Sequence, residues 1–244
     1  SRIQTTTDSI ELYAVNENCE NYYSKRKDVY DINNNSNTEE LVNYDSAYLN
    51  LISPNSLLTS EIARNYNDKN ESIVAPQIAI IDKETNSATI DLDIKNNYTS
   101  TISEVTLLGR VPFEGNKYVV QGKDLGSNFT TSMNNTGIQI PDNLKQYAKV
   151  YYSENEEATR YLQDLNNGWT ENPSDFSKIK SYLITLGDYQ VPQNASYTFS
   201  YSINIPNGLD YNKIAYSHHA VYFSLDTDEG KYRTYTEPNK LGFM

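Results

Sequence analysis

Residues for thiol and imidazole chemistry are almost missing from this chain, which has one cysteine and two histidines in 244 residues. Cys19 cannot form a disulfide within one chain, so an apolar core must stabilise the fold. The acidic neighbours Glu17 and Glu20 disfavour a thiolate, which argues against a cysteine nucleophile. His218 and His219 are adjacent, and adjacent side chains of a strand point to opposite faces, so they cannot bind one metal ion together. We assign no catalytic residue, no metal site and no cofactor.

Positive charge and long apolar runs are also scarce. Asp and Glu number 32 against 20 Lys and Arg, for a net charge of −12. Such a chain is repelled by phosphate backbones and by anionic lipids, which argues against a nucleic-acid partner. No window approaches the roughly 20 apolar residues of a membrane span, so we expect no direct membrane insertion. The chain starts at Ser1 without an apolar signal segment, and we expect it to be part of a longer protein.

Tyrosine is abundant, with 22 residues against 6 Phe and 1 Trp. Hydroxylated rings suit sheet faces that are half wet. The bias toward Asn, Tyr, Lys and Ile is also typical of an AT-rich genome, and it indicates a low-GC bacterium.

Strict alternation of apolar and polar residues marks the clearest strands. Tyr197, Phe199 and Tyr201 alternate with Ser and Thr up to Pro206, and residues 88–94 alternate in the same way. This period of two predicts half-buried antiparallel strands. Further strands are expected at 9–15, 47–52, 57–66, 77–81, 105–111, 151–152, 180–186, 213–225 and 231–236. The fold class that follows is all-β, an antiparallel β-sandwich.

One segment, residues 153–166, has a helical pattern instead. Ser153 and Glu156 have the spacing of a capping box, apolar residues follow at 158, 161, 162 and 165, and Gly168 stands where a helix would end. We therefore expect one short helix there. Trp169 follows directly, and packing against this helix is favoured over a role as an exposed sugar platform.

Several blocks resemble repeat units of large Gram-positive, clostridial-type cell-surface proteins, the immunoglobulin-like DUF11 type. The blocks are RVPFEGN at 110–116, KVYYSENEEATRYL at 149–162, NNGWTENPSDFSKIKSYLI at 166–184, FSYSINIP at 199–206 and TEPNKLGF at 236–243. The resemblance covers residues 76–244 and implies one immunoglobulin-like repeat domain. Residues 1–75 match nothing similar, and we expect a β- and loop-rich segment, the tail of a preceding unit.

This resemblance implies an extracellular, secreted, cell-wall-associated module that acts as an adhesin or a structural stalk. Its partners would be a host matrix protein or a glycan, together with neighbouring repeats of the same chain. A carbohydrate-binding accessory domain of a cell-wall hydrolase is the alternative. An enzyme in its own right ranks last, because no nucleophile and base stand in a recognisable arrangement.

Two acidic groups allow chemical alternatives. Asp226, Asp228 and Glu229 precede Gly230 as in a calcium loop, but the rest of an EF-hand is missing and a hairpin turn is favoured. Asp91 and Asp93 share one strand face, as paired glycosidase carboxylates might. Their phase within the alternation favours a solvated face instead.

An intramolecular isopeptide bond is a minority hypothesis. This chemistry joins a deprotonated lysine to an asparagine amide in an apolar core beside a protonated acid. Asn239 with Lys83 or Lys95, and Asp91 or Asp93 as the acid, are the candidates. Asn239 follows a proline, however, which is a setting typical of an exposed turn.

Overall fold

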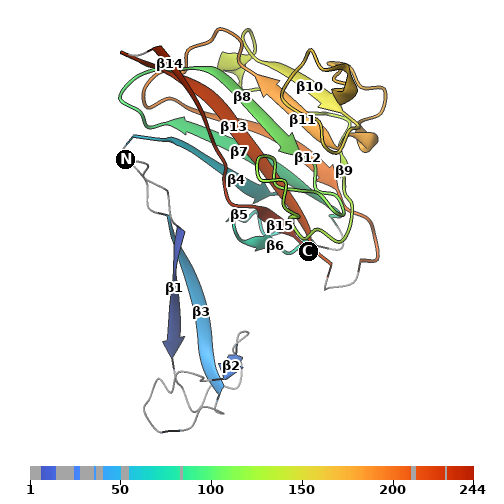
Figure 1. The fold of residues 1–244 in the computed structure, drawn as a ribbon. Coiled ribbons are helices and arrows are strands. Elements are labelled where there is room, and N and C mark those ends of the chain that lie inside the picture. Colours follow the sequence, from blue (N-terminus) through green and yellow to red (C-terminus); the bar gives the residue numbers. More distant parts are fainter. Residues whose placement is uncertain are drawn as a thin grey trace. The chain divides into compact units, whose positions relative to one another are not determined.

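The computed structural model describes residues 7–14, 25–27, 36, 41–50, 55–82, 85–209, 213–228 and 230–244. The chain divides into two compact units, residues 1–54 and 55–244. The first contains an antiparallel three-stranded sheet in the order β1-β3-β2 (Figure 1). Its strands are β1 (Thr7–Ala14), β2 (Lys25–Lys27) and β3 (Leu41–Asn50).

The second unit is a sandwich of two sheets, which confirms the predicted fold class. The five-stranded sheet has the order β5-β4-β7-β12-β9, and the seven-stranded sheet has the order β10-β11-β8-β13-β15-β6, with β14 paired to β13. The strands of the first sheet are β4 (Leu57–Arg64), β5 (Ser72–Val74), β7 (Ser87–Asn96), β9 (Ser132–Met133) and β12 (Ser196–Asn204). Those of the second are β6 (Ile78–Ala79), β8 (Ile102–Arg110), β10 (Lys149–Ser153), β11 (Ser181–Thr185), β13 (Ala215–Thr227), β14 (Gly230–Thr236) and β15 (Leu241–Phe243).

The connections follow the immunoglobulin pattern, in which the chain crosses between the sheets. β7 and β12 pair in one sheet, while the strands that follow them, β8 and β13, pair in the other (Figure 1). The sequence placed the domain boundary at residues 75 and 76. The contacts divide the chain between Pro54 and Asn55, because β4 pairs along its whole length with β7.

The core lies between the two sheets and consists of the inward side chains of both. Tyr197, Phe199, Tyr201 and Ile203 of β12 are all buried, as their alternation predicts. Tyr182 of β11 meets Tyr201 across the core with ring centroids 5.2 Å apart. The Tyr182 ring also lies over Gly109 on the neighbouring strand, where an added Cβ would be only 2.1 Å from Tyr182 Cζ.

The helix expected at 153–166 is wrong, since the described residues contain no α-helix, only 3-10 turns such as Leu165–Asn167. Ser153 ends β10, and its hydroxyl donates to the Asn167 carbonyl instead of capping a helix. The Asn155 side chain accepts from the Glu157 amide at 2.8 Å, and Arg110 binds the Ala158 carbonyl. These side chains satisfy the backbone locally and leave it unavailable for helical bonds.

No helix among the described residues is long and apolar enough to cross a membrane.

Candidate binding surface

A buried polar row crosses the outer face of the seven-stranded sheet. Register places Ser181, Arg110 and His218 side by side on β11, β8 and β13. Arg110 is 6% exposed, and its guanidinium donates to Ser181 Oγ at 2.9 Å and to the Ala158 carbonyl at 2.8 Å. Burial lowers the pKa of Arg110 to about 10, so the group stays charged at neutral pH. Arg110 thereby fastens the loop that carries Ala158 onto the sheet.

His218 continues this row and is neutral. Its ring is fully buried and lies edge-on to Tyr118, with centroids 4.7 Å apart. Burial, with a smaller effect of His219, lowers the pKa of His218 to about 3. Glu237 Oε1 is 3.8 Å from His218 Nε2, too far for a hydrogen bond, and burial raises the pKa of Glu237. These residues form a packed base for the loops above them and not a proton relay.

An exposed aromatic cluster lies farther along the same face. Tyr222 of β13 and Tyr235 of β14 are register partners with centroids 6.0 Å apart. The Arg160 guanidinium is 4.3 Å from the centre of the Tyr222 ring and 5.4 Å from that of Tyr161. Tyr161 is 51% exposed and Tyr235 is 50% exposed. We call Arg160, Tyr161, Tyr222 and Tyr235 the aromatic patch. Rigid amphipathic rings beside a stacked guanidinium are typical anchors of binding surfaces.

Glu104 fixes the edge strand that carries Tyr235. It lies where the pairing of β8 with β13 is irregular, and it has a positive φ of 54°. Its carboxylate accepts from Arg233 at 3.0 Å, from Ser224 at 2.6 Å and from Lys231 at 3.1 Å. These bonds, led by that of Arg233, lower the pKa of Glu104 to about 2. The hairpin of β13 and β14 is thus clamped next to the patch.

A second polar group, in the core, links the two sheets. His219 of β13 contacts Glu61 of β4, with 2.7 Å from Nδ1 to Oε1, and Thr59 of β4, with 2.6 Å from Nε2 to Oγ1. Nucleophilic hydroxyls have such partners, but the Thr59 hydroxyl donates its one hydrogen to the Asp93 carbonyl at 2.8 Å. His219 must therefore donate to Thr59. The geometry supports a structural tie between the sheets and not an activated nucleophile.

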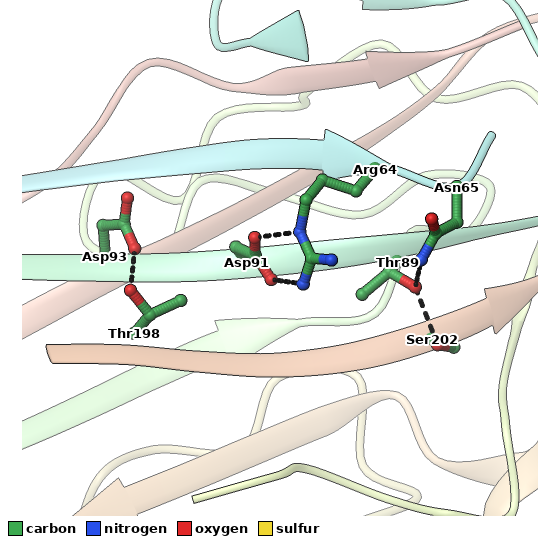
Figure 2. A network of polar contacts seen from close by, with 7 residues as sticks. All are labelled: Arg64, Asn65, Thr89, Asp91, Asp93, Thr198 and Ser202. Carbon is green, nitrogen blue, oxygen red and sulfur yellow. Dashed lines mark hydrogen bonds and ion pairs between the residues drawn. The ribbon is translucent and has the colours of Figure 1, made fainter. Parts of the chain in front are cut away.

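Asp91 and Asp93 lie on the outer face of the five-stranded sheet (Figure 2). Arg64 donates to both Asp91 oxygens, at 2.5 and 2.7 Å, and Asp93 accepts from Thr198 Oγ1 at 2.6 Å. A glycosidase acid needs a carboxyl oxygen that is free to reach the substrate, whereas Arg64 occupies both oxygens of Asp91. This argues against a catalytic pair. The hydroxyls of Thr89 and Ser202 continue the polar face, 3.1 Å apart.

The remaining candidates from the sequence are dispersed. Cys19, Lys83 and Glu229 lie outside the described residues. Asp226 and Asp228 are exposed at the end of the β13–β14 hairpin, and the described part of the chain has no group of three His, Cys, Asp or Glu that could hold a metal ion.

The structure also bears on the isopeptide hypothesis and on Trp169. Lys95 and Asn239 are both exposed, which contradicts the buried setting that an isopeptide bond between them requires. Trp169 is half-buried, and its Nε1 donates to the Thr159 carbonyl at 3.0 Å. It therefore contacts a loop and not the expected helix.

No protein-family model and no curated protein matches the chain. Among solved structures, a collagen-binding domain from a Staphylococcus aureus adhesin is 12% identical, with a TM-score of 0.30 over 66% of this chain and 93% of that chain. The collagen adhesin of S. aureus is 10% identical, with a TM-score of 0.34 over 83% and 55%. AvmM, which catalyses a macrocyclization in alchivemycin A biosynthesis, is 8% identical, with a TM-score of 0.25 over 76% and 89%. The chain thus has distant structural similarity to adhesin domains and to an enzyme.

Proposed function

We propose that the chain is a non-catalytic binding module of a bacterial surface protein, and that it acts in adhesion through the aromatic patch. The observation that carries this proposal is the geometry of the patch. Arg160 is stacked on the partly buried ring of Tyr222. Tyr161 and Tyr235, each about half exposed, lie beside this pair. All four rest on paired strands or on a loop fastened by Arg110, so little conformational entropy is lost when a ligand binds.

A carbohydrate-binding accessory role is the second candidate. Exposed tyrosine rings offer flat apolar faces on which sugars stack, and Arg160 adds hydrogen-bond donors beside them. A matrix protein would use the same rings as anchors. The two ligand classes therefore have to be compared on the same variants.

The test measures binding of the full chain to a panel of matrix proteins, collagen included, and to a glycan array. Tyr161→Ala and Tyr235→Ala are expected to weaken binding of any ligand at least tenfold, about 1.4 kcal/mol. Tyr232→Ala is the matched control, because Tyr232 lies on the same strand, is 53% exposed and occupies the opposite strand face. Binding that survives both patch substitutions would refute the proposal, and the absence of any ligand would favour a structural stalk.

A further inference from the structure

The loop that carries Arg160 and Tyr161 of the aromatic patch, residues 153–169, is closed like an Ω-loop. Its ends are joined by a two-way backbone bridge between Tyr152 and Thr170, with N to O distances of 2.8 and 3.0 Å. Arg110 fixes its middle at the Ala158 carbonyl. Compact surface loops of this kind are frequently functional.

The side chain of Asn167 holds the loop together by hydrogen bonds from inside. This side chain is 2% exposed, and its Nδ2 donates to the Tyr161 carbonyl at 2.8 Å and to Thr159 Oγ1 at 3.0 Å. Its Oδ1 accepts from the Thr159 amide at 2.8 Å, and its own carbonyl accepts from Ser153. The loop is therefore ordered before any partner arrives.

This loop holds three large side chains in solvent. Leu165 is 92% exposed, Leu162 is 41% exposed and Tyr161, which also belongs to the aromatic patch, is 51% exposed. Single exposed apolar residues are common, but three within five residues of one ordered loop concentrate apolar side chains on a short surface segment. Leucine side chains offer neither hydrogen bonds nor a flat ring to a sugar. The apolar tip of the loop therefore fits a protein better than a glycan.

The charge around this tip is negative. Residues 153–171 contain five carboxylates, Glu154, Glu156, Glu157, Asp164 and Glu171, against Arg160 alone. Arg160 is stacked on Tyr222, and Glu157 is bound to Lys117 at 2.6 Å. Across the patch, Lys231 and Arg233 are both neutralised in part by Glu104. The loop thus combines exposed apolar side chains with an excess of carboxylates, which we call its acidic rim.

We propose that this loop binds a basic protein segment, in which apolar residues are flanked by Lys or Arg. The apolar residues cover Leu162, Leu165 and the neighbouring tyrosine, while the basic flanks face the acidic rim. This inference rests on the proposed function and specifies the ligand class for the same face of the sheet.

The test uses the full chain and three synthetic peptides with fluorescence polarisation. One peptide has a Leu-Phe-Leu centre flanked by lysines, the second has glutamates in place of the lysines, and the third keeps the lysines around a serine centre. The lysine peptide with the apolar centre is expected to bind at least tenfold tighter than either of the others. Leu162→Ser with Leu165→Ser should weaken its binding at least tenfold. Glu154→Gln with Glu156→Gln should weaken it and reduce its salt dependence, whereas Tyr232→Ala should leave it unchanged.

Equal affinity for the lysine and glutamate peptides, or no binding of either, would overturn the inference. Binding to phosphatidylcholine vesicles that is lost with the leucine substitutions would also overturn it, in favour of a lipid surface. Glycan binding that depends on Tyr235 and not on the leucines would refute the basic segment and leave the proposed binding module intact. Peptide binding that needs the leucines and Tyr161 but not Tyr235 would support the loop and refute the rest of the patch.

Discussion

Glu61 and His219 meet between the two sheets with both side chains fully buried, and Glu61 Oε1 lies 2.7 Å from His219 Nδ1. The contact joins residues 158 positions apart, and the other Glu61 oxygen has no hydrogen-bond partner. A buried pair of this kind costs solvation free energy when it forms, and it costs more when one partner is removed. Its contribution to stability can be measured by substitution.

Glu61→Ala is expected to lower the free energy of unfolding by about 3–5 kcal/mol, because it leaves His219 buried with an unpaired ring nitrogen. Glu61→Gln should cost less, since the amide keeps a polar contact. Urea unfolding followed by the fluorescence of Trp169, the single tryptophan, reports on this unit. The paired apolar change Glu61→Leu with His219→Phe should cost less than the two single changes summed. If Glu61→Ala lowers the free energy of unfolding by less than about 1 kcal/mol, the contact between Glu61 and His219 does not stabilise the sandwich.

Gly109→Ala tests the contact between β8 and β11. The new methyl would lie 2.1 Å from Tyr182 Cζ, and the ring is fully buried, so we expect a loss of about 3 kcal/mol in urea unfolding. Tyr182→Leu in the same chain should recover part of it. Gly115→Ala is the control, because Gly115 has open space and only a positive φ of 78°, which costs about 1 kcal/mol. Equal losses at both glycines would refute the steric explanation.

Glu104 predicts a pH dependence. Its pKa falls from 4.5 in the unfolded chain to about 2 in the fold, so the folded state favours the carboxylate. The stabilisation is complete above pH 4.5 and is lost as the pH falls toward about 2. Glu104→Gln should therefore be less stable than the parent chain at pH 7 and equal to it near pH 2, in denaturant titrations at several pH values. A stability difference that does not change with pH would exclude this origin.

Asn167→Ala should loosen the loop without unfolding the sandwich. The change removes the bonds to Thr159 and Tyr161, and we expect a loss of about 1–3 kcal/mol together with faster hydrogen exchange of the amides between 155 and 168. Asn166→Ala is the neighbouring control, since that side chain is exposed. Unchanged exchange in Asn167→Ala would show that Arg110, Ser153 and the bridge between Tyr152 and Thr170 order the loop without this side chain.

The sequence predicted the parts of the fold that follow from local alternation. β7 and β12 each have one buried and one polar face, so a period of two identifies them. β8 and β11 were predicted too, although they alternate less clearly, because Leu108 and Leu183 are buried on the side opposite the core. Such strands show continuous apolar runs without a phase.

The helix prediction failed for a related reason. The spacing of residues 153–165 satisfies a helical pattern, yet the Ser153 hydroxyl and the Asn155 and Asn167 side chains bind backbone groups of the loop. Arg110, which is distant in the sequence, adds a hydrogen bond to the Ala158 carbonyl that no local pattern reveals.

The sequence indicated tyrosine-rich sheet faces but named no residue of the candidate binding surface. Arg160, Tyr222 and Tyr235 come from a loop and two strands, and no local motif joins them. The sequence did contain one signal for the buried pair of Glu61 and His219. Glu61 occupies the same strand face as Ala63 in β4, and a carboxylate in an inward phase indicates a buried partner.

The ring of Tyr182 over Gly109 also fixes which residues of β8 and β11 can face one another. Sliding β11 by one residue would turn Tyr182 outward and set Leu183 against the glycine, and sliding it by two would press the ring onto a strand position that has a side chain. Only one alignment leaves a gap for the ring. The pairing of Gly109 with Tyr182 thus disfavours misaligned registers of β8 and β11.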